Sequence, residues 1–361
     1  MADSIKGRIV FLDYMRVFAF VSVLIGHKFE AEITTMLSAS SDQALLRVIA
    51  TFLYNICYGG AAGVIVFFIT SGYIITHVLQ SESPVEFFIK RIFRIYPLYI
   101  AAVVMEALSY YALTGSIETS LRVWIPRILL IGDFFETPHA LGGVEWTLRV
   151  EIMFYLFMTI LKATGILNKT TWLPLVVLTA TLALYALPQI PGPTIWINGY
   201  FTLYAPFLFI GVCIYLMQTQ KASAYLCVAA IIIIAAFFVK TLPVFHPTWS
   251  TFNFAIPAIC IFVGAWALRS VLPDSGALRL LSSMTYSIYL FHNWLWGFIL
   301  VAVEKFGSSH ISVKAQTLII LFFACYMAHR AIELNAIKLG KRLTVYFSQT
   351  NKNRLNTSQA L

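Results

Sequence analysis

Ten apolar segments of membrane-spanning length run through the sequence and constrain its fold more than any other feature. A helix that crosses a bilayer needs about 20 apolar residues. Only helices and closed barrels satisfy their backbone polar groups in hydrocarbon, and the alternating strands of a barrel are missing here. The sequence therefore predicts an all-α, polytopic integral-membrane bundle of about ten transmembrane helices. The segments are residues 9–27, 60–80, 95–114, 146–165, 172–188, 199–217, 224–239, 252–271, 282–303 and 315–334.

Composition excludes most other classes of protein. Hydrophobic residues make up 60% of the chain and charged residues 11%, whereas a soluble domain has about 45–50% and about 25%. The net charge of +9 comes from basic residues that stand singly or in small clusters, so we predict no nucleic-acid partner. The five cysteines lie in or beside apolar runs without metal-type spacing, and we predict neither a disulfide nor a metal site.

Charge distribution predicts the orientation. Placing both termini in the cytoplasm assigns sixteen Lys and Arg residues to that side and seven to the other, as the positive-inside rule favours. Residues 1–340 form the predicted membrane domain, and residues 341–361 form a flexible polar cytoplasmic tail. Two weaker apolar stretches remain: residues 44–57, expected at the membrane interface, and residues 121–135, expected to form a re-entrant or surface helix.

The N-terminal segment resembles a signal peptide in one respect only. Lys6 and Arg8 precede its apolar run, but Asp13 and Arg16 interrupt that run and no small-residue cleavage site follows. We therefore expect an uncleaved first span.

The first span carries three ionisable residues at depth, Asp13, Arg16 and His27. Each costs about 2.5–3.5 kcal/mol on insertion scales, which makes a functional role the default hypothesis. Asp13 can pair with Arg16 one turn away. Arg16 and His27 are eleven residues apart and share a helix face, with a rise of about 16 Å between them. The spacing predicts one polar stripe that links the two leaflets. A structural ion pair beside an ordinary interfacial histidine remains the alternative.

The fourth span places a carboxylate near an interfacial tryptophan. Trp146 fits an aromatic belt, and Glu151 lies deeper and needs a partner. Arg149 is two residues from Glu151 and faces away from it. We expect Glu151 to meet His27, Arg16 or a substrate hydroxyl; a protonated glutamate bonded to a neighbouring helix is the alternative.

Other polar positions have both a structural and a functional interpretation. Ser71-Gly72 permits close helix approach and offers one hydroxyl, although no base stands beside Ser71 in sequence. Lys90, Arg91 and Arg94 are either topology markers or a phosphate clamp. His292 is either a ligand or a buried histidine bonded to backbone.

The tenth span ends near the membrane surface with His329, Arg330 and Glu333. For these residues we expect structural pairing.

Five motifs resemble the acyltransferase-3 family of bacterial membrane proteins, which O-acylate extracytoplasmic sugars. They recur in family order over nearly the whole chain. The usual Glu-basic-Pro sequence of the family's last span appears here as Glu333-Leu334-Asn335, so no function is carried onto Glu333. The motifs are Leu12-Asp13-Tyr14-Met15-Arg16 with His27, Phe67 to Gly72, Lys90 to Pro97, Trp146-Thr147-Leu148 with Glu151, and Tyr286 to His292.

The resemblance implies transfer of an acyl group, usually acetyl, from cytoplasmic acetyl-CoA or another acyl-CoA to a hydroxyl of a cell-surface polysaccharide or lipid-linked sugar. It also implies the bacterial inner membrane. His27 would be the base, with Glu151 or Asp13 orienting it, and Arg16 would hold the acyl-CoA or stabilise the oxyanion. The expected residues that bind the acyl-CoA are Lys90, Arg91 and Arg94, and the expected substrate-binding residues are Ser71, Trp146 and His292.

The rival hypothesis is a proton-coupled transporter that uses the buried Asp, Arg, His and Glu as a relay. The sequence shows no internal repeat of the inverted-repeat transporter type.

Overall fold

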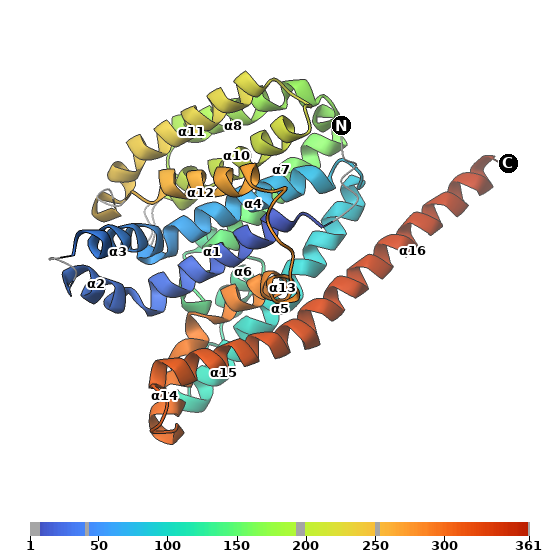
Figure 1. Ribbon diagram of the computed structural model, residues 1–361. Helices are drawn as coiled ribbons and strands as arrows, with labels where there is room; N and C mark the ends of the chain where they lie inside the picture. Colours follow the sequence, from blue (N-terminus) through green and yellow to red (C-terminus); the bar gives the residue numbers. More distant parts are fainter. Residues whose placement is uncertain (1–7, 40–42, 193–198, 250–252, 360–361) are drawn as a thin grey trace.

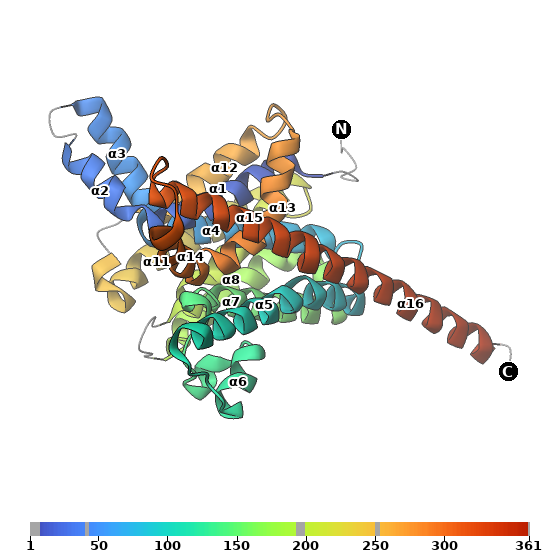
Figure 2. The same ribbon diagram turned by 90° about the horizontal axis from the view of Figure 1, so that it is seen from below.

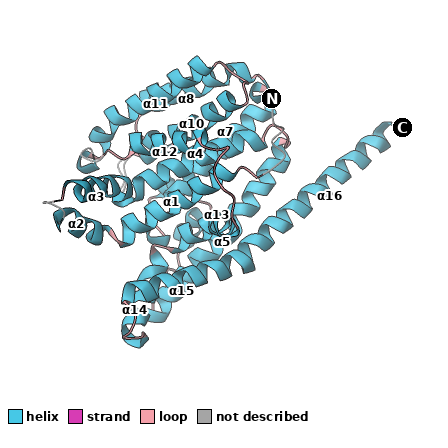
Figure 3. Ribbon diagram, in the orientation of Figure 1, coloured by secondary structure: helices cyan, strands magenta, loops and turns pink. Residues whose placement is uncertain are grey.

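The computed structural model describes residues 8–39, 43–192, 199–249 and 253–359, and these residues contain helices but no strand (Figures 1 and 3). Lys6 and the end of the predicted tail lie outside them. The predicted all-helical class is confirmed. The helices are α1 (Val10–Lys28), α2 (Glu30–Ala39), α3 (Ala44–Cys57), α4 (Ala61–Val78), α5 (Pro84–Thr114), α6 (Leu121–Ile128), α7 (Trp146–Ala163), α8 (Leu173–Ala186), α9 (Tyr200–Tyr204), α10 (Pro206–Gln218), α11 (Ala224–Phe245), α12 (Ala255–Ala267), α13 (Gly276–Phe291), α14 (Trp294–Phe306), α15 (Val313–Ala328) and α16 (Leu334–Gln359).

By length and apolar composition, six helices of the described residues could cross a membrane, or seven if one bent pair counts as a single span. The bent pair is α13 and α14, which meet at 82°. The predicted span 282–303 is therefore not one straight helix. The predicted spans 172–188 and 252–271 correspond to shorter apolar helices, and residue 252 lies outside the described part. The multi-pass architecture holds, while the total of ten and the cytoplasmic termini stay predictions.

Helix α4 occupies the centre of the bundle, beside α1, α10 and α12 (Figure 1). Small residues let these helices approach closely, as in other membrane bundles. A Cβ atom on Gly63 would lie 2.4 Å from the Ala19 carbonyl oxygen of α1. A Cβ atom on Gly72 would lie 1.8 Å from the Leu208 carbonyl oxygen of α10. The close helix approach predicted for Ser71-Gly72 is confirmed, and Gly72 is the residue that permits it.

Helix α13 packs on α1, α7 packs on α4, and α5 contacts both α7 and α13. Helix α16 crosses α5, where Gly340 lies against Phe93, and then projects away from the bundle (Figures 1 and 2). Its backbone is helical across residue 340, so the helix runs through the predicted boundary between membrane domain and tail.

The two weaker apolar stretches form helices. Residues 44–57 form α3, whose Leu45 and Val48 are largely exposed. Residues 121–135 form the short helix α6 and a 3-10 turn, Gly132–Phe135. The end of α3 packs against α1 and leads into α4, and apolar sequence of membrane-spanning length runs through both, as Ala44–Val78, whereas α6 lies at the edge of the bundle in Figure 2.

Candidate active site

Asp13 and Arg16 lie in the first half of α1, on the wall of a cavity of about 370 Å³. Asp13 is 2% exposed. Its carboxylate accepts hydrogen bonds from Arg8 Nε and Ser282 Oγ, both at 2.5 Å, and lies 3.6 Å from Arg16 Nη1. The predicted Asp13–Arg16 pair is therefore present, with Ser282 and Arg8 as additional partners.

We call this space the arginine cavity. Its lining comes from α1, α4, α5, α13 and the segment that joins α15 to α16. That segment is a π-helical turn, His329–Glu333, and it places two titratable residues at the cavity. The cavity is lined by Arg8, Ile9, Leu12, Asp13, Arg16, Ile74, His77, Arg94, Ser282, Ser283, His329, Glu333, Leu334 and Ile337.

Glu333 is 1% exposed and has two partners. Ser287 Oγ donates to its carboxylate at 2.8 Å, and His329 Nδ1 lies 2.8 Å from the same oxygen. The structural pairing expected for His329 and Glu333 is confirmed. Their position on the arginine cavity was not expected, because residues 329 and 13 are brought together only by packing of the helices.

The three basic residues at the start of α5 do not act as one cluster. Lys90 Nζ is held by the carboxylates of Glu82 at 2.7 Å and Glu86 at 2.6 Å. Arg94 lines the arginine cavity, whereas Arg91 lines a separate one. The predicted clamp of three cations is thus divided between a lysine bound by two carboxylates and two arginines that line different cavities.

His27 lies near the end of α1, on the wall of a cavity of about 270 Å³ that we call the histidine cavity. The His27 side chain is accessible. Four large aromatic side chains share the lining with two histidines and a few small residues. The lining residues are Val23, His27, Gly59, Ala61, Val64, Gly143, Val144, Trp146, Tyr204, His246, Trp249 and Tyr289.

The bend between α13 and α14 places a second imidazole, that of His292, beside His27. His292 Nε2 lies 3.0 Å from His27 Nδ1, and the two rings stack with centroids 5.1 Å apart. His292 is 1% exposed, and its Nδ1 lies 2.7 Å from the Tyr289 carbonyl oxygen. Beside this pair, Lys28 Nζ donates to Asn293 Oδ1 at 2.7 Å. The contact between the end of α1 and the bend that joins α13 to α14 is therefore polar at two consecutive residues on each side.

Arg16 and His27 do not share a cavity. The arginine and histidine cavities have no lining residue in common. Between them, α1 is packed by Ala19, Phe20 and Val23, which are 3–4% exposed. The predicted continuous stripe is therefore corrected: apolar packing separates two polar ends of the same helix.

Glu151 is bonded to a neighbouring helix, as in the alternative interpretation, and not to His27 or Arg16. Ser71 Oγ donates to its carboxylate at 2.7 Å and Tyr155 OH donates at 2.5 Å. Ser71 and Glu151 are each 7% exposed and line none of the three cavities described here. The expected contact of Glu151 with His27 or Arg16 is replaced by a buried network between α4 and α7. Sequence reasoning also missed that a carboxylate lies beside the Ser71 hydroxyl.

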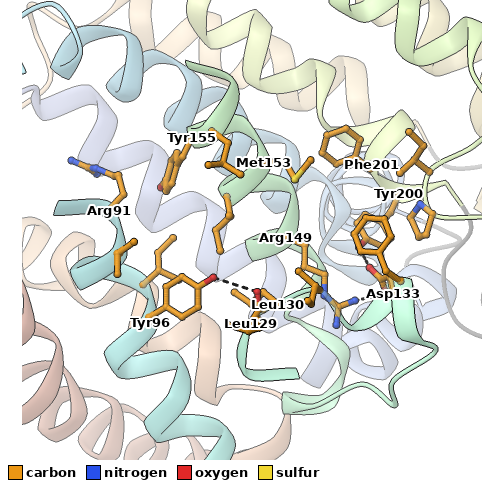
Figure 4. Close-up of a pocket in the computed structure, with 18 of the residues that line it drawn as sticks. Arg91, Tyr96, Leu129, Leu130, Asp133, Arg149, Met153, Tyr155, Tyr200 and Phe201 are labelled. Carbon is orange, nitrogen blue, oxygen red and sulfur yellow. Dashed lines mark hydrogen bonds and ion pairs between the residues drawn. The ribbon is translucent and has the colours of Figure 1, made fainter. Parts of the chain in front are cut away.

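The third cavity, of about 670 Å³, is lined mainly by apolar side chains of α5, α7 and residues 129–134 (Figure 4). Arg91 and Tyr155 lie at one end. At the other end, Arg149 binds Asp133, which also accepts a hydrogen bond from Tyr200. Asp133 and Tyr200 carried no signal in the sequence, because their pairing with Arg149 joins segments more than 15 residues apart.

A tryptophan separates this apolar cavity from the histidine cavity. The Trp146 ring packs on Tyr200, with centroids 5.2 Å apart, and on Tyr204, with centroids 5.1 Å apart. Tyr200 lines the apolar cavity, and Trp146 and Tyr204 line the histidine cavity. Trp146 is thus a wall of the histidine cavity as well as a residue of the α7 N-terminus.

These features define a multi-pass helical membrane protein with a cationic cavity and a histidine cavity along one helix. The sequence profile of the acyltransferase domain family, acyltransferase-3, matches residues 9–328. The chain belongs to this family.

Two curated proteins are similar to parts of the chain. Nodulation protein 10 of Rhizobium leguminosarum bv. viciae is 31% identical over 131 residues, which cover 31% of this chain and 35% of that protein. Acyltransferase MdmB of Streptomyces mycarofaciens is 28% identical over 115 residues, which cover 30% of each chain. The matched region thus spans about a third of each relative. No solved structure matches the chain.

Proposed function

We propose that this acyltransferase moves an acyl group from an acyl-CoA, most simply acetyl-CoA, to a hydroxyl of a glycan or lipid-linked sugar. The acceptor would occupy the histidine cavity on the outer side of a bacterial inner membrane. The donor would enter from the cytoplasmic side, at the arginine cavity. His27 would act as the general base.

The observation that carries this proposal is an accessible imidazole on the wall of an aromatic cavity. His27 shares the histidine cavity with Trp146, Tyr204, Trp249 and Tyr289. Aromatic faces carry partial negative charge and attract the C–H-bearing faces of sugar rings. Histidine has the pKa range suited to removing a proton from a hydroxyl as it attacks. An alcohol of a sugar is therefore the acceptor that this lining suits best.

The arginine cavity suits the donor because a CoA carries several phosphates. Arg16 and Arg94 offer guanidinium groups, which bind phosphate bidentately. The carboxylate of Asp13 is shared with Arg8 and Ser282, so it neutralises Arg16 only in part. Lys90 is bound by two carboxylates and is not assigned to the donor site. Arg91, one turn before Arg94, would contribute at longer range.

The distance between the cavities supports a role for Arg16 in binding the donor rather than in stabilising the oxyanion. Arg16 and His27 are separated by about 16 Å along α1. A guanidinium at Arg16 therefore does not reach a thioester that is attacked at His27. The pantetheine arm must extend along α1 from the arginine cavity, and the packing around Ala19 and Phe20 must open to admit it.

The reaction follows from these positions. His27 accepts the proton of the acceptor hydroxyl as its oxygen attacks the thioester carbonyl carbon. The tetrahedral intermediate then expels the CoA sulfur, the C–S bond breaks, and His27 returns the proton to the thiolate. The products are a sugar ester and CoA. Trp146 forms part of the wall of the acceptor site, whereas His292 does not line it and contacts His27 from behind.

The test is transfer of a labelled acetyl group from acetyl-CoA to a sugar acceptor by the purified protein in lipid nanodiscs. We expect ester formation by the wild type and none by His27→Ala. His310→Ala is the matched control, because His310 is exposed in a loop. A wild-type protein that forms no ester but moves protons or solutes across vesicles would favour the transporter hypothesis instead.

A further inference from the structure

We propose that His292 is a positioning residue that fixes the tautomer of His27, so that the lone pair of His27 lies on Nε2. The inference rests on the proposed function only for its catalytic consequence. The tautomer itself follows from three groups in a row: the Tyr289 carbonyl, the His292 ring and the His27 ring.

The chain of hydrogen bonds has one consistent direction. A carbonyl oxygen only accepts, so His292 Nδ1, 2.7 Å from the Tyr289 oxygen, carries a hydrogen. A neutral imidazole carries one hydrogen, which leaves a lone pair on His292 Nε2. His27 Nδ1 lies 3.0 Å from that atom and must therefore be the donor. The remaining lone pair of neutral His27 is then on Nε2. A hydrogen donated from Nε2 to the Gly59 carbonyl, which also faces this ring, is the competing arrangement.

A charge on either ring would be unfavourable, because His292 is buried and the charged group beside the pair is an ammonium group. That group belongs to Lys28, which adjoins His27 in sequence. Its ammonium group is bonded to Asn293, directly after His292. Tyr289 OH, the other titratable group at this contact, donates to the Val144 carbonyl and accepts from Thr147. Among the described residues, no carboxylate is bonded to either ring, so neither imidazole has a counter-ion that would retain a second proton.

The surroundings hold His292 in place. It follows the last residue of α13, where the chain bends by 82° into α14. The next residue, Asn293, donates through Nδ2 to the Gly142 carbonyl at 2.7 Å. The Tyr289 ring stacks on Phe67 of α4 with an interplanar angle of 2°. The acceptor for His27 Nδ1–H is thus fixed by α4, by residues 142–144 and by the bend itself.

The catalytic consequence is that the proton-accepting atom of His27 is chosen before substrate arrives. A histidine base works with one nitrogen, and the hydrogen bond at the other nitrogen decides which one. With Nδ1–H occupied by His292, Nε2 receives the hydroxyl proton. Without His292, the base populates the wrong tautomer and part of its catalytic contribution, about 10²–10⁴-fold for such a base, is lost.

The direct test is ¹⁵N NMR of the protein, labelled with ¹⁵N-histidine, in nanodiscs. The signals of His27 are assigned as those that disappear in His27→Gln. We expect His27 to be protonated on Nδ1 in the wild type. In His292→Phe, which keeps a ring of similar size, we expect the Nε2-protonated form to appear. His27 protonated on Nε2 in the wild type, or a tautomer unchanged in His292→Phe, would overturn the proposal. This readout does not depend on activity, so the tautomer can be tested even if the proposed acyl transfer is not observed.

Kinetics supply the second test. In His292→Gln, a side-chain carbonyl can accept from His27 Nδ1–H. We expect kcat to fall about 10²-fold in His292→Phe with little change in the acceptor KM, and to recover in large part in His292→Gln. An increase in acceptor KM with unchanged kcat would make His292 a substrate-binding residue instead. Equal kcat losses in both variants would also contradict the proposal.

Discussion

Gly72 of α4 and Gly211 of α10 face each other where the two helix backbones meet. A Cβ on Gly72 would lie 1.8 Å from the Leu208 carbonyl oxygen, and a Cβ on Gly211 would lie 2.0 Å from the Ile69 carbonyl oxygen. Ser71, which binds Glu151, stands directly beside this contact. This tight contact between α4 and α10 thus adjoins a buried polar network.

We expect Gly72→Ala to destabilise the protein by about 1–3 kcal/mol, the usual cost of overpacking, because the opposing atoms belong to backbone and cannot rotate away. Thermal unfolding in detergent, followed by loss of the monodisperse species, measures the effect. Gly264→Ala is the matched control, since nothing lies within 4 Å of a Cβ at that position. Equal melting temperatures for the two variants would show that the α4–α10 contact relaxes.

Asp13→Asn should destabilise the protein more than a surface charge change. The buried Asp13 carboxylate serves Arg8, Arg16 and Ser282, and removing one partner of a buried pair costs about 3–5 kcal/mol. The same change at Asp274, whose pair with Arg279 is at the surface, should have little effect on stability. The double variant Asp13→Asn with Arg16→Gln should regain part of the loss. Additive losses would mean that the two charges do not interact.

Arg94→Gln should raise the KM for acyl-CoA about tenfold or more and leave the acceptor KM unchanged. A hydrogen bond to a charged group contributes about 1.5–3 kcal/mol, and Arg94 shares its cavity with Arg16. We expect a smaller increase for Arg91→Gln, because Arg91 lines the apolar cavity. Steady-state kinetics with acetyl-CoA as the varied substrate make the comparison. Arg269→Gln, an exposed position, is the control; an Arg94 variant that matches it would remove Arg94 from the donor site.

Ser71→Ala should retain acyl transfer while lowering stability by about 1.5–3 kcal/mol, because Glu151 loses one of its two hydroxyl donors. The adjacent carboxylate gives Ser71 a base, but its side chain is 7% exposed and lines none of the three cavities. If the acyl group passes directly from donor to acceptor, the Ser71→Ala variant should therefore remain active. A complete loss of transfer, together with an acyl adduct on Ser71 of the wild type in mass spectrometry, would establish a covalent route.

The sequence by itself determined the membrane class, the helices and the identity of the polar residues. These depend on local properties: the length of an apolar run, the cost of a charge within it and the spacing of residues on one helix. The paired state of Asp13 and Arg16 and the tight contact at Gly72 belong to this group, since helical spacing and the absence of a side chain are visible in the sequence.

Only the tertiary structure decided which polar groups meet. His27 contacts His292 across 265 residues, Glu151 contacts Ser71 instead of His27, and Arg91 and Arg94 line different cavities. Each outcome depends on how helices rotate and cross, and on the 82° bend that follows α13. Rotation about a helix axis is set by packing against its neighbours, which the pattern of one helix does not contain.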